Sequence, residues 1–491
     1  MLIINKKMYN TIEKILKQTP FNKDNVKTDS RKVAPGDIFV AIKGTRYDGH
    51  DYILGALKKG AKLVLCEEEI AGLSDDDRKK VIRVEDTKKT LALIAKHVFN
   101  DPSNSLKVYG ITGTNGKTTT AFLIDKILNT AGTDSGFITT VFTKTAGEEV
   151  TRSSMTTPDS VTLNSLLRDM AANGKKAAVM EVSSHALDQE RVCGIEFASA
   201  VFTNITPEHL DYHGSMEKYL KDKSRIFENL KANSIAVLNQ DDQSVRSIKS
   251  AITGRVVTFG IKERADIIAR NIKLSSDGTS FDLIIDNAGS LHVETKLIGE
   301  HNVYNILASV AALVDSGIDL SVFEKALNEA VSVPGRLELV TDKTPFRIFV
   351  DYAHTPDALE NVLKCLKDLS ENRLMCVFGC GGDRDKTKRP VMGEIASRIC
   401  DKVIITSDNP RTEDPQEIIN QIEKGVLKGA DYSIILDRKK AIFEAIDKAK
   451  EKDIIVIAGK GHEDYQIIGD KVLEFDDKKV ALEILKELKY I

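Results

Sequence analysis

Short apolar runs alternate with helical patterns over most of the chain. Near its start, apolar runs occur at 37–42, 61–66 and 80–84. Residues 87–99 follow, and their apolar side chains recur at the spacing of one helix face. Short runs separated by polar segments are typical of strands. The pattern therefore predicts a small α/β unit at the beginning of the chain.

A turn-forming segment at 101–105 separates this unit from a longer α/β region, because Pro102 cannot extend the preceding helix. Helical segments lie between most strand-like runs of the longer region, which indicates a parallel sheet. Residues 265–297 differ, since their apolar runs have no helix between them and contain an Asp277-Gly278 turn. That turn predicts an antiparallel hairpin at the edge of the sheet. The strand-like runs of this region are 106–109, 177–182, 198–203, 235–238 and 256–259.

Residues 333–336, Val-Pro-Gly-Arg, mark a second boundary because proline and glycine together interrupt regular structure. Strands and helical patterns alternate again after it, and each strand runs into a polar or glycine-rich loop, where open parallel sheets bind ligands. These strands are 347–351, 374–378, 402–406, 433–436 and 453–458. We predict an α/β protein of three domains: a small N-terminal α/β domain (1–102), a central parallel sheet with an antiparallel edge (103–334) and a C-terminal Rossmann-like, doubly wound domain (335–491).

Composition narrows the class of protein. With 42% hydrophobic and 29% charged residues, the 491-residue chain has the balance of a globular protein and not of a disordered one. A net charge of -3 disfavours a nucleic-acid binder that depends on bulk positive charge. No apolar run is long enough for a signal peptide or a membrane span, and the six cysteines are scattered. We expect a cytoplasmic protein with reduced thiols, no nucleic-acid partner and no membrane insertion.

The most informative motif lies at residues 108–119, Val-Tyr-Gly-Ile-Thr-Gly-Thr-Asn-Gly-Lys-Thr-Thr. A strand precedes it and a helical pattern follows, so backbone N–H groups and the helix dipole can bind phosphate. Lys117 would reach the β- and γ-phosphates, and the Thr118 hydroxyl would ligate Mg2+. The usual spacing places glycine where this chain has Ile111, and a purely structural glycine turn is the alternative. We predict a P-loop-type ATP site formed by Gly113, Thr114, Asn115, Gly116, Lys117, Thr118 and Thr119.

Two further side chains follow neighbouring strands of the central region. Glu181 comes after four apolar residues at a strand end, where its carboxylate would be placed to bind Mg2+ directly. A solvated glutamate is the alternative. His209, in the polar segment 203–213, could ligate the ion or stabilise phosphate charge, although single histidines are more often simply packed or solvent-facing.

Lys223 interrupts an apolar stripe. In residues 216–230 the apolar side chains lie on one helix face, and Lys223 fills the gap in that face. Burying a bare ammonium is costly, so an inward lysine either extends its amine to water or serves a purpose. On the residues alone, extension to water is the more common outcome.

The Gly-Thr-x-Gly-Lys-Thr loop of this variant form resembles that of the Mur ligases, ATP-dependent amide-forming enzymes of peptidoglycan precursor synthesis. The resemblance covers nearly the whole chain. It implies catalytic roles for Lys117, Glu181 and His209 with ATP and Mg2+ as cofactors. It also implies that Lys223, four residues after Tyr219, is carbamylated, because this arrangement matches the family's modified lysine. The carbamate would be a bidentate anion that can hold a second Mg2+.

The same resemblance implies binding roles for several loops. Asn302 and Asn305 would contact the nucleotide, although a capped helix start explains them equally well. Arg336 and His354 would also contact it, and Ser30 would bind the UDP group. Contacts to the muramoyl-dipeptide are implied for Thr156, Thr157, Ser183, Gln189 and Arg191.

The segment Asp408-Asn409-Pro410-Arg411 resembles the motif by which diaminopimelate-adding members of the family recognise their amino acid, whereas lysine-adding relatives lack the arginine. Diaminopimelate differs from lysine by one extra carboxylate, and a guanidinium can bind that carboxylate with two parallel hydrogen bonds. An exposed loop charge is the alternative for Arg411. The other implied amino-acid contacts are Arg384, Gly459 and Glu463, the last a partner for an ammonium group.

These features predict an ADP-forming ligase that joins meso-2,6-diaminopimelate to UDP-N-acetylmuramoyl-L-alanyl-D-glutamate through an acyl phosphate, acting as a monomer. Two alternatives stay open. One is a sibling ligase, such as a folylpolyglutamate synthetase or a lysine-adding enzyme. The other is a nucleotide-gated switch that hydrolyses ATP without joining two substrates.

Overall fold

A computed structural model describes residues 12–17, 20–44, 47–153 and 155–491. The chain forms two compact units, one made of Met1–Ile268 and Leu307–Val322 and the other of Ala269–Ile306 and Phe323–Ile491. The predicted α/β class is confirmed. Within the described residues, no helix combines the length and apolar character needed to cross a membrane.

The first unit begins with a small parallel sheet in the order β1-β2-β3-β4. Successive residues of β2 face two cores, with Ile38 and Val40 in one and Phe39 in the other. The predicted N-terminal α/β unit is therefore confirmed, including its long helix. The elements are β1 (Val26–Lys27), β2 (Ile38–Val40), β3 (Leu63–Cys66), β4 (Val81–Arg83), α2 (Ile53–Lys58), α3 (Asp75–Arg78) and α4 (Thr87–Val98).

The main sheet of the first unit has parallel strands in the order β12-β11-β10-β5-β9-β6, followed by the antiparallel edge strands β7 and β8. The strands are β5 (Lys107–Thr112), β6 (Ser135–Ile138), β7 (Phe142–Ala146), β8 (Glu149–Arg152), β9 (Ala177–Glu181), β10 (Phe197–Phe202), β11 (Leu230–Asn239) and β12 (Arg255–Gly260). The predicted parallel sheet is confirmed. The β7–β8 hairpin was not predicted, because its mostly polar sequence lacks a clear apolar alternation.

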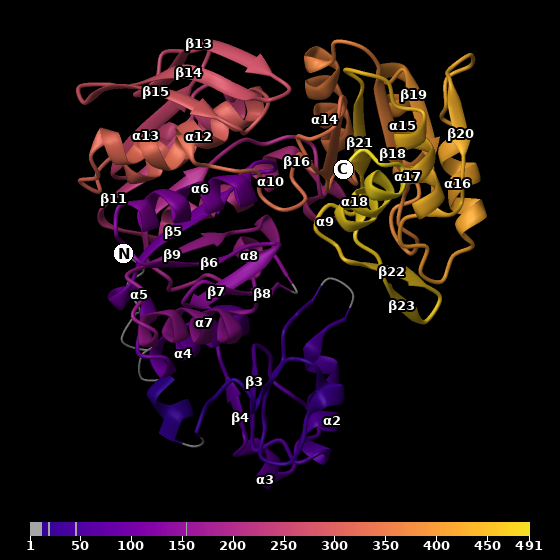
Figure 1. The fold of residues 1–491 in the computed structure, drawn as a ribbon. Helices are drawn as coiled ribbons and strands as arrows, with labels where there is room; N and C mark the ends of the chain where they lie inside the picture. Colours follow the sequence, from indigo (N-terminus) through magenta and orange to yellow (C-terminus); the bar gives the residue numbers. More distant parts are fainter. Residues whose placement is uncertain (1–11, 18–19, 45–46, 154) are drawn as a thin grey trace. The chain divides into compact units, whose positions relative to one another are not determined.

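Helices cover this sheet and connect its parallel strands. Figure 1 shows α4 and α7 side by side, so the N-terminal segment packs on the main part of the first unit. The prediction of an irregular linker at 101–105 is wrong in detail, since Pro102 occupies the first turn of a short helix, where its missing N–H costs nothing. The helices are α5 (Pro102–Ser105), α6 (Lys117–Thr130), α7 (Ser160–Ala172), α8 (Ser184–Asp188), α9 (Leu210–His213), α10 (Met216–Ser224) and α11 (Gln243–Ser247).

The strands β13 (Ile267–Ser275), β14 (Gly278–Ile285) and β15 (Gly289–Thr295) extend the same hydrogen-bonded sheet beyond β12. β14 and β15 pair antiparallel throughout, from Thr279 opposite Thr295 to Ile285 opposite Gly289. β13 and β14 are also neighbours in this sheet and are joined by a turn at 276–277. This is the hairpin predicted at Asp277-Gly278, so the predicted antiparallel edge at residues 265–297 is confirmed. The helices α12 (Glu300–Leu313) and α13 (Leu320–Asn328) follow.

The second unit contains a six-stranded sheet in the order β16-β17-β21-β18-β19-β20, parallel except for β16. Its strands are β16 (Glu338–Leu339), β17 (Arg347–Asp351), β18 (Leu374–Phe378), β19 (Lys402–Ile405), β20 (Tyr432–Ile434) and β21 (Ile454–Ala458). Alternate strand residues enter two different cores, one completed by α14, α15 and α16 and the other by α17 and α18.

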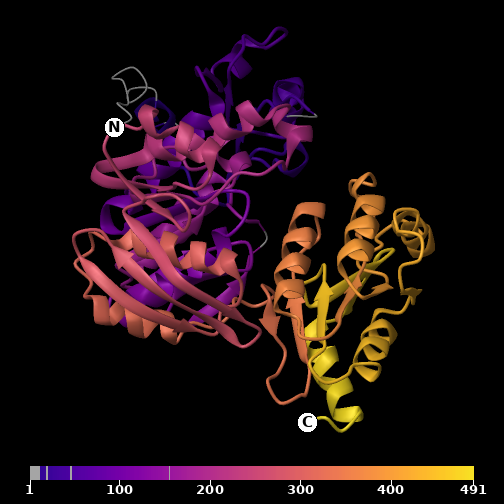
Figure 2. The same cartoon turned by 90° about the horizontal axis from the view of Figure 1, so that it is seen from above.

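Figures 1 and 2 show these helices on both faces of the sheet, which confirms the doubly wound prediction. The helices are α14 (Pro356–Leu369), α15 (Lys388–Ile399), α16 (Pro415–Glu423), α17 (Arg438–Asp447) and α18 (Asp477–Glu487). A separate hairpin, β22 (Tyr465–Ile468) with β23 (Lys471–Glu474), follows β21.

Candidate functional site

The loop between β5 and α6 has a backbone that depends on glycine. Gly113 has φ +145° and Gly116 has φ +86°. A Cβ atom at Gly113 would lie 1.9 Å from Thr203 Oγ1, so no other residue fits there without moving the loop. The loop is bound to the end of β10, where Asn115 N donates to Asn204 Oδ1 (2.9 Å). Its conformation is therefore preset at the start of α6, the end of a helix that attracts phosphate.

Two lysines converge on this loop. Lys117 Nζ donates to the carbonyls of Gly113 (2.9 Å) and Thr114 (2.7 Å), and Lys223 Nζ donates to the Gly113 carbonyl (2.7 Å). Lys223 is 2% exposed and lies over the Tyr219 ring, 4.7 Å from its centre. Burial, together with the neighbouring Lys117 charge, lowers the pKa of Lys223 well below its usual value. The prediction that Lys223 points inward is confirmed, and its amine does not extend to water.

Glu181 ends β9 directly beside the start of the loop, because it pairs with Ile111 of β5. The side chain is fully buried and accepts hydrogen bonds from Thr140 N (2.8 Å) and Thr140 Oγ1 (3.0 Å). A solvated glutamate is therefore excluded. Thr118, a buried residue in the first turn of α6, carries a hydroxyl, so the carboxylate at the end of β9 and this hydroxyl are both hard oxygen donors.

These donors suit Mg2+ bound together with phosphate. Across the described ranges, no three His, Cys, Asp or Glu side chains are grouped so that they could hold a metal ion by themselves. Mg2+ is usually bound by one or two carboxylates with substrate phosphates and waters, so a protein cage is not required. Glu181 and Thr118 match that pattern.

His209 precedes α9 in a left-handed conformation, with φ +55°. Its half-exposed ring meets the ring of His185 edge-on, 4.8 Å between centres. Burial and the nearby Lys223 charge lower the pKa of His209, while Glu208 acts in the opposite direction. Burial and the two neighbouring histidines lower the pKa of His185 to about 4. At neutral pH these imidazoles are therefore neutral.

A buried hydrogen-bonded chain that the sequence analysis missed connects α8, α9 and α10. His213 Nδ1 lies 2.8 Å from Asp222 Oδ2, and His213 Nε2 lies 3.0 Å from Ser184 Oγ. Asp222 is the neighbour of Lys223 in the sequence. These hydrogen bonds therefore help to hold α10 in the orientation that directs Lys223 toward the phosphate loop. The signal available in the sequence was the second histidine of residues 209–213, which has no chemistry of its own until the fold supplies its partners.

The residues implied for the muramoyl-dipeptide lie together beside Glu181. Thr157 Oγ1 donates to the Glu181 carbonyl (2.9 Å) and accepts from Ser183 N (3.0 Å). Arg191 donates to the Thr157 carbonyl (2.8 Å) and to Gln189 Oε1 (2.7 Å). Thr156 belongs to the same group, through a 3.1 Å hydrogen bond from Thr140 Oγ1. Ser30 instead lies in a short 3-10 helix, Ser30–Lys32, of the N-terminal segment.

In the second unit, the implied amino-acid contacts gather at the carboxyl ends of β18, β19 and β21. Asn409 Nδ2 donates to Glu463 Oε2 (2.8 Å), and a Cβ at Gly459 would lie 2.7 Å from Asp408 Oδ2. Arg411 donates to the Gly382 carbonyl (2.8 Å). Burial and the Asp408 charge raise the pKa of Glu463. The Arg411 guanidinium and the partly buried Glu463 carboxylate thus lie at the same group of strand ends. Arg384 is exposed on the adjoining loop, and Pro410 lies within the motif.

The implied nucleotide contacts of the second unit form two groups. Lys388 Nζ donates to the His354 carbonyl (2.7 Å), and the Arg336 guanidinium lies over the Tyr352 ring, 4.9 Å from its centre. Asn305 Nδ2 donates to Asn302 Oδ1 (3.0 Å) near the start of α12, so these amides contact each other. Nucleotide contact by these four residues stays a prediction.

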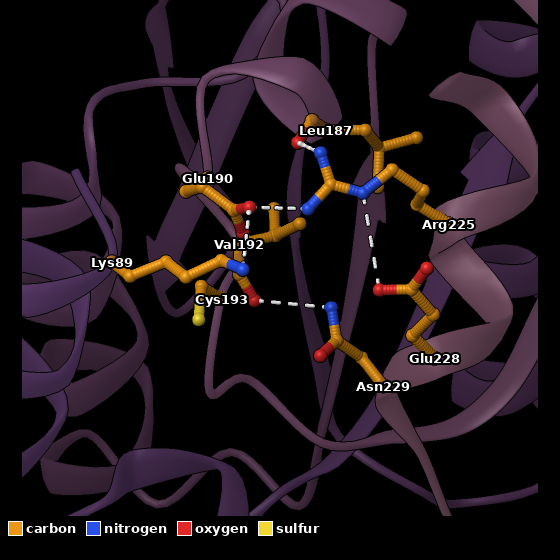
Figure 3. Close-up of a pocket in the computed structure, with 8 residues that line it drawn as sticks. All are labelled: Lys89, Leu187, Glu190, Val192, Cys193, Arg225, Glu228 and Asn229. Carbon is orange, nitrogen blue, oxygen red and sulfur yellow. Dashed lines mark hydrogen bonds and ion pairs between the residues drawn. The ribbon is translucent and has the colours of Figure 1, made fainter. Parts of the chain in front are cut away.

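A small pocket in the first unit is lined mainly by charged side chains that bind one another (Figure 3). Glu190 Oε1 lies 3.5 Å from Lys89 Nζ and also accepts from Arg225, while Asn229 Nδ2 donates to the Val192 carbonyl (3.4 Å). The cavity of about 20 Å³ has room for roughly one water molecule. It is therefore too small for a substrate and serves as a polar junction between α4 and the segment after α8.

Comparisons with known proteins identify the family of the chain. Three family profiles match the chain: the Mur ligase family, catalytic domain, at residues 24–99; the Mur ligase middle domain at 111–313; and the Mur ligase, glutamate ligase domain, at 335–461. The sequence-based resemblance is thereby confirmed. The predicted domain limits at 102 and 334 stay predictions.

Similar curated proteins span almost the whole chain. A protein of Halalkalibacterium halodurans named UDP-N-acetylmuramoyl-L-alanyl-D-glutamate--2,6-diaminopimelate ligase is 45% identical over 466 residues, 94% of each chain. A Clostridium acetobutylicum protein with the same name, numbered 1, is 44% identical over 467 residues, 95% of each chain.

Solved structures support the same fold. One described as UDP-N-acetylmuramoyl-L-alanyl-D-glutamate--2,6-diaminopimelate ligase has a TM-score of 0.68 at 34% identity and covers 95% of both chains. The MurF ligase of Thermotoga maritima in complex with ADP has a TM-score of 0.60 at 24% identity, covering 95% of this chain and 98% of that one. The second likeness concerns the fold alone.

Proposed function

We propose, since the chain belongs to the Mur ligase family, that it is the ATP-dependent ligase that joins meso-2,6-diaminopimelate to UDP-N-acetylmuramoyl-L-alanyl-D-glutamate in peptidoglycan precursor synthesis. The observation that carries the proposal is the Asp408–Arg411 loop of the second unit. It brings a guanidinium and, through Asn409, the partly buried carboxylate of Glu463 to the same strand ends. An amino acid with a second carboxylate and a free amine would find a partner for each group there.

The reaction begins with activation of a carboxylate, because a free carboxylate does not react with an amine. An oxygen of the D-glutamyl γ-carboxylate attacks the γ-phosphorus of ATP, and the bond to ADP breaks. The amine of diaminopimelate then attacks the acyl carbon, loses a proton and displaces phosphate. The chain's own contribution to the first step is the preset loop after β5, with Lys117 at its centre to neutralise phosphate charge.

Mg2+, when bound, would neutralise charge on the phosphate oxygens, with Thr118, Glu181 and carbamylated Lys223 as the residues that hold it. Carbamylation of Lys223 is supported by its burial, since burial lowers the pKa of the amine and so favours its neutral form, which is the form that attacks carbon dioxide. The N–C bond forms and one proton leaves.

The remaining assignments follow the sequence-based predictions. His209 is proposed to contact the transferred phosphate as a neutral imidazole, because its pKa is lowered. Asn302, Asn305, Arg336 and His354 are proposed for the nucleotide. The UDP and muramoyl-dipeptide contacts are Ser30, Thr156, Thr157, Ser183, Gln189 and Arg191. A cytoplasmic location and a monomeric state stay predictions.

The proposal is tested by ADP release from ATP in the presence of UDP-N-acetylmuramoyl-L-alanyl-D-glutamate, with either diaminopimelate or lysine as acceptor. We expect release that depends on the dipeptide precursor and is much faster with diaminopimelate, and loss of that preference in Arg411→Ala. Equal rates with both amino acids in the unmodified enzyme would contradict the substrate assignment. ADP release that ignores both co-substrates would indicate a nucleotide switch instead of a ligase.

A further inference from the structure

Arg389, in the first turn of α15, is a fully buried arginine that the proposed reaction does not use. Its Nη1 and Nη2 donate to Glu413 Oε2 and Oε1, both at 3.0 Å, which is the two-bond geometry of an arginine with a carboxylate. Its other contacts are Gln421 Oε1 (2.8 Å) and the Gly381 carbonyl (3.1 Å). A buried charge is retained only where its partner and hydrogen bonds are well placed, so this ion pair is strongly specified.

Glu413 connects the ion pair to the loop that follows β18. Its Oε1 accepts from Asp383 N (2.7 Å), and its backbone N donates to the Pro410 carbonyl (3.1 Å). Asp383 in turn accepts from Thr412 Oγ1 (2.7 Å). One carboxylate therefore joins the loop after β18, the loop after β19 and the start of α15.

Arg411 lies inside this joined region in a backbone conformation that arginine rarely adopts, with φ +52°. Such a conformation is strained for a residue with a side chain and persists only where the surroundings impose it. Its guanidinium donates to the Gly382 carbonyl (2.8 Å), while Gly382 N donates to the Asn409 carbonyl (2.9 Å). A Cβ at Gly382 would lie 1.9 Å from the Pro410 carbonyl oxygen, so the two loops are in tight contact.

We propose that the Arg389–Glu413 ion pair is a positioning element for amino-acid specificity, which keeps the two loops together and so aims the Arg411 guanidinium at the second carboxylate of the acceptor. The inference rests on the proposed role of Arg411. Neither Arg389 nor Glu413 touches the substrate. Their effect is on the orientation of Arg411, and so on the discrimination between diaminopimelate and lysine.

The test compares Glu413→Gln with the unmodified full-length enzyme, using KM and kcat for diaminopimelate, lysine and ATP. Glutamine has nearly the shape of glutamate but loses the charge, so the fold is retained more readily than with removal of Arg389. We expect KM for diaminopimelate to rise roughly ten- to a hundred-fold, as a displaced positioning group does. KM for ATP and for lysine should stay within about twofold, because their contacts do not involve Arg411. Arg389→Lys, which cannot form the two-bond pair, should act in the same direction.

A matched control is Arg373→Met, which breaks another ion pair with a buried carboxylate in the same sheet. Arg373 Nε donates to Asp453 Oδ1 (3.3 Å) beside the amino ends of β18 and β21, the edge opposite the loops. Asp453 is fully buried. This variant should lose thermal stability and keep the preference for diaminopimelate over lysine.

Three outcomes separate the inference from the proposed function. Glu413→Gln is made alone and together with Arg411→Ala. If it lowers the preference for diaminopimelate over lysine when made alone, but has no further effect together with Arg411→Ala, then Glu413 acts through Arg411, as inferred. If Arg411→Ala abolishes the preference while Glu413→Gln and Arg389→Lys leave it unchanged, the inference is overturned and the proposed function stands. If Arg411→Ala itself leaves the preference unchanged, the substrate assignment fails, and with it the basis of the inference.

Discussion

The phosphate loop of the first unit and the Asp408–Arg411 loop of the second unit both follow a parallel strand, yet they are shaped in different ways. Glycine geometry sets the first, at Gly113 and Gly116, and backbone atoms provide much of its surface. Contacts between separate segments set the second, where Arg389 of α15 pairs with Glu413, two residues after the strained Arg411. The comparison teaches that a site built from backbone depends on local sequence, whereas a site built from ion pairs depends on the whole fold.

The largest expected effect is that of Gly113→Ala. The added Cβ would lie 1.9 Å from Thr203 Oγ1 and the backbone has φ +145°, so the loop must move away from the phosphates. We expect kcat/KM for ATP to fall by at least about a thousandfold, the loss that follows when a group positioned for the transition state is removed. Steady-state ADP release measures it.

Gly132→Ala is the control for that variant. Gly132 follows the same helix, also has positive φ (+76°), and has no atom within 4 Å of an added Cβ. It should cost roughly 1 kcal/mol of stability and leave kcat/KM nearly unchanged. Similar activity losses in the two variants would mean that backbone strain, and not the shape of the phosphate loop, is responsible.

Lys223→Gln should have the next largest effect, a fall in kcat of roughly a hundredfold or more. Glutamine removes the amine that would carry the carbamate, while Tyr219 and the α10 face stay in place. Acetate should restore part of the rate by supplying a carboxylate in the vacated space, measured as kcat against acetate concentration. A variant with unaltered kcat would show that Lys223 only buries its stem beside the loop.

Arg411→Lys sharpens the comparison at the amino-acid site. Lysine keeps the charge but offers a single point donor, so the paired hydrogen bonds to a carboxylate are lost. KM for diaminopimelate should rise roughly tenfold while KM for ATP is unchanged. Kinetic measurements with each substrate varied in turn test this, and equal increases in both KM values would contradict it.

The smallest effect concerns pH and stability. The pKa of His185 is about 4 in the folded chain against a usual 6.5, so the unfolded chain binds more protons between these values. The free energy of unfolding should therefore rise with pH from about 4 to 6.5 and lose this contribution as the pH falls. The free energy of unfolding can be measured by urea unfolding of the unmodified enzyme and of His185→Gln. The two measurements are made at about pH 7 and about pH 5, because these values lie above and within that window. Identical pH dependence in the two proteins would contradict the prediction.

Local patterns were sufficient for much of the fold. The strand runs, the helix Thr87–Val98 and the hairpin of β13 and β14 lie where apolar spacing and turn residues place them. The hairpin of β7 and β8 was missed, because its pairing at the sheet edge comes from its neighbour β6 and not from its own alternation. The short helix α5 was missed for a related reason, since one turn beginning at Pro102 leaves no periodic signal.

The candidate site also has parts that the sequence indicates and parts that only the fold shows. The phosphate loop, the strand-end carboxylate Glu181 and the inward-facing Lys223 were identified from sequence, because each belongs to one continuous segment. The hydrogen-bonded side chains of Ser184, His213 and Asp222 join three helices. These three residues share no pattern in the sequence. Such networks become visible only when the helices are packed.

By itself, the sequence determined the α/β class and the places of the glycine-rich loop after β5 and of the Asp408–Arg411 segment, because backbone preferences and apolar periods act over a few neighbouring residues. The tertiary structure alone decided that the Lys223 amine is buried against the Gly113 carbonyl and that Arg389 reaches Glu413. Burial and charge pairing depend on distances between segments that lie far apart in the chain. Those distances exist only after the strands and helices have come together.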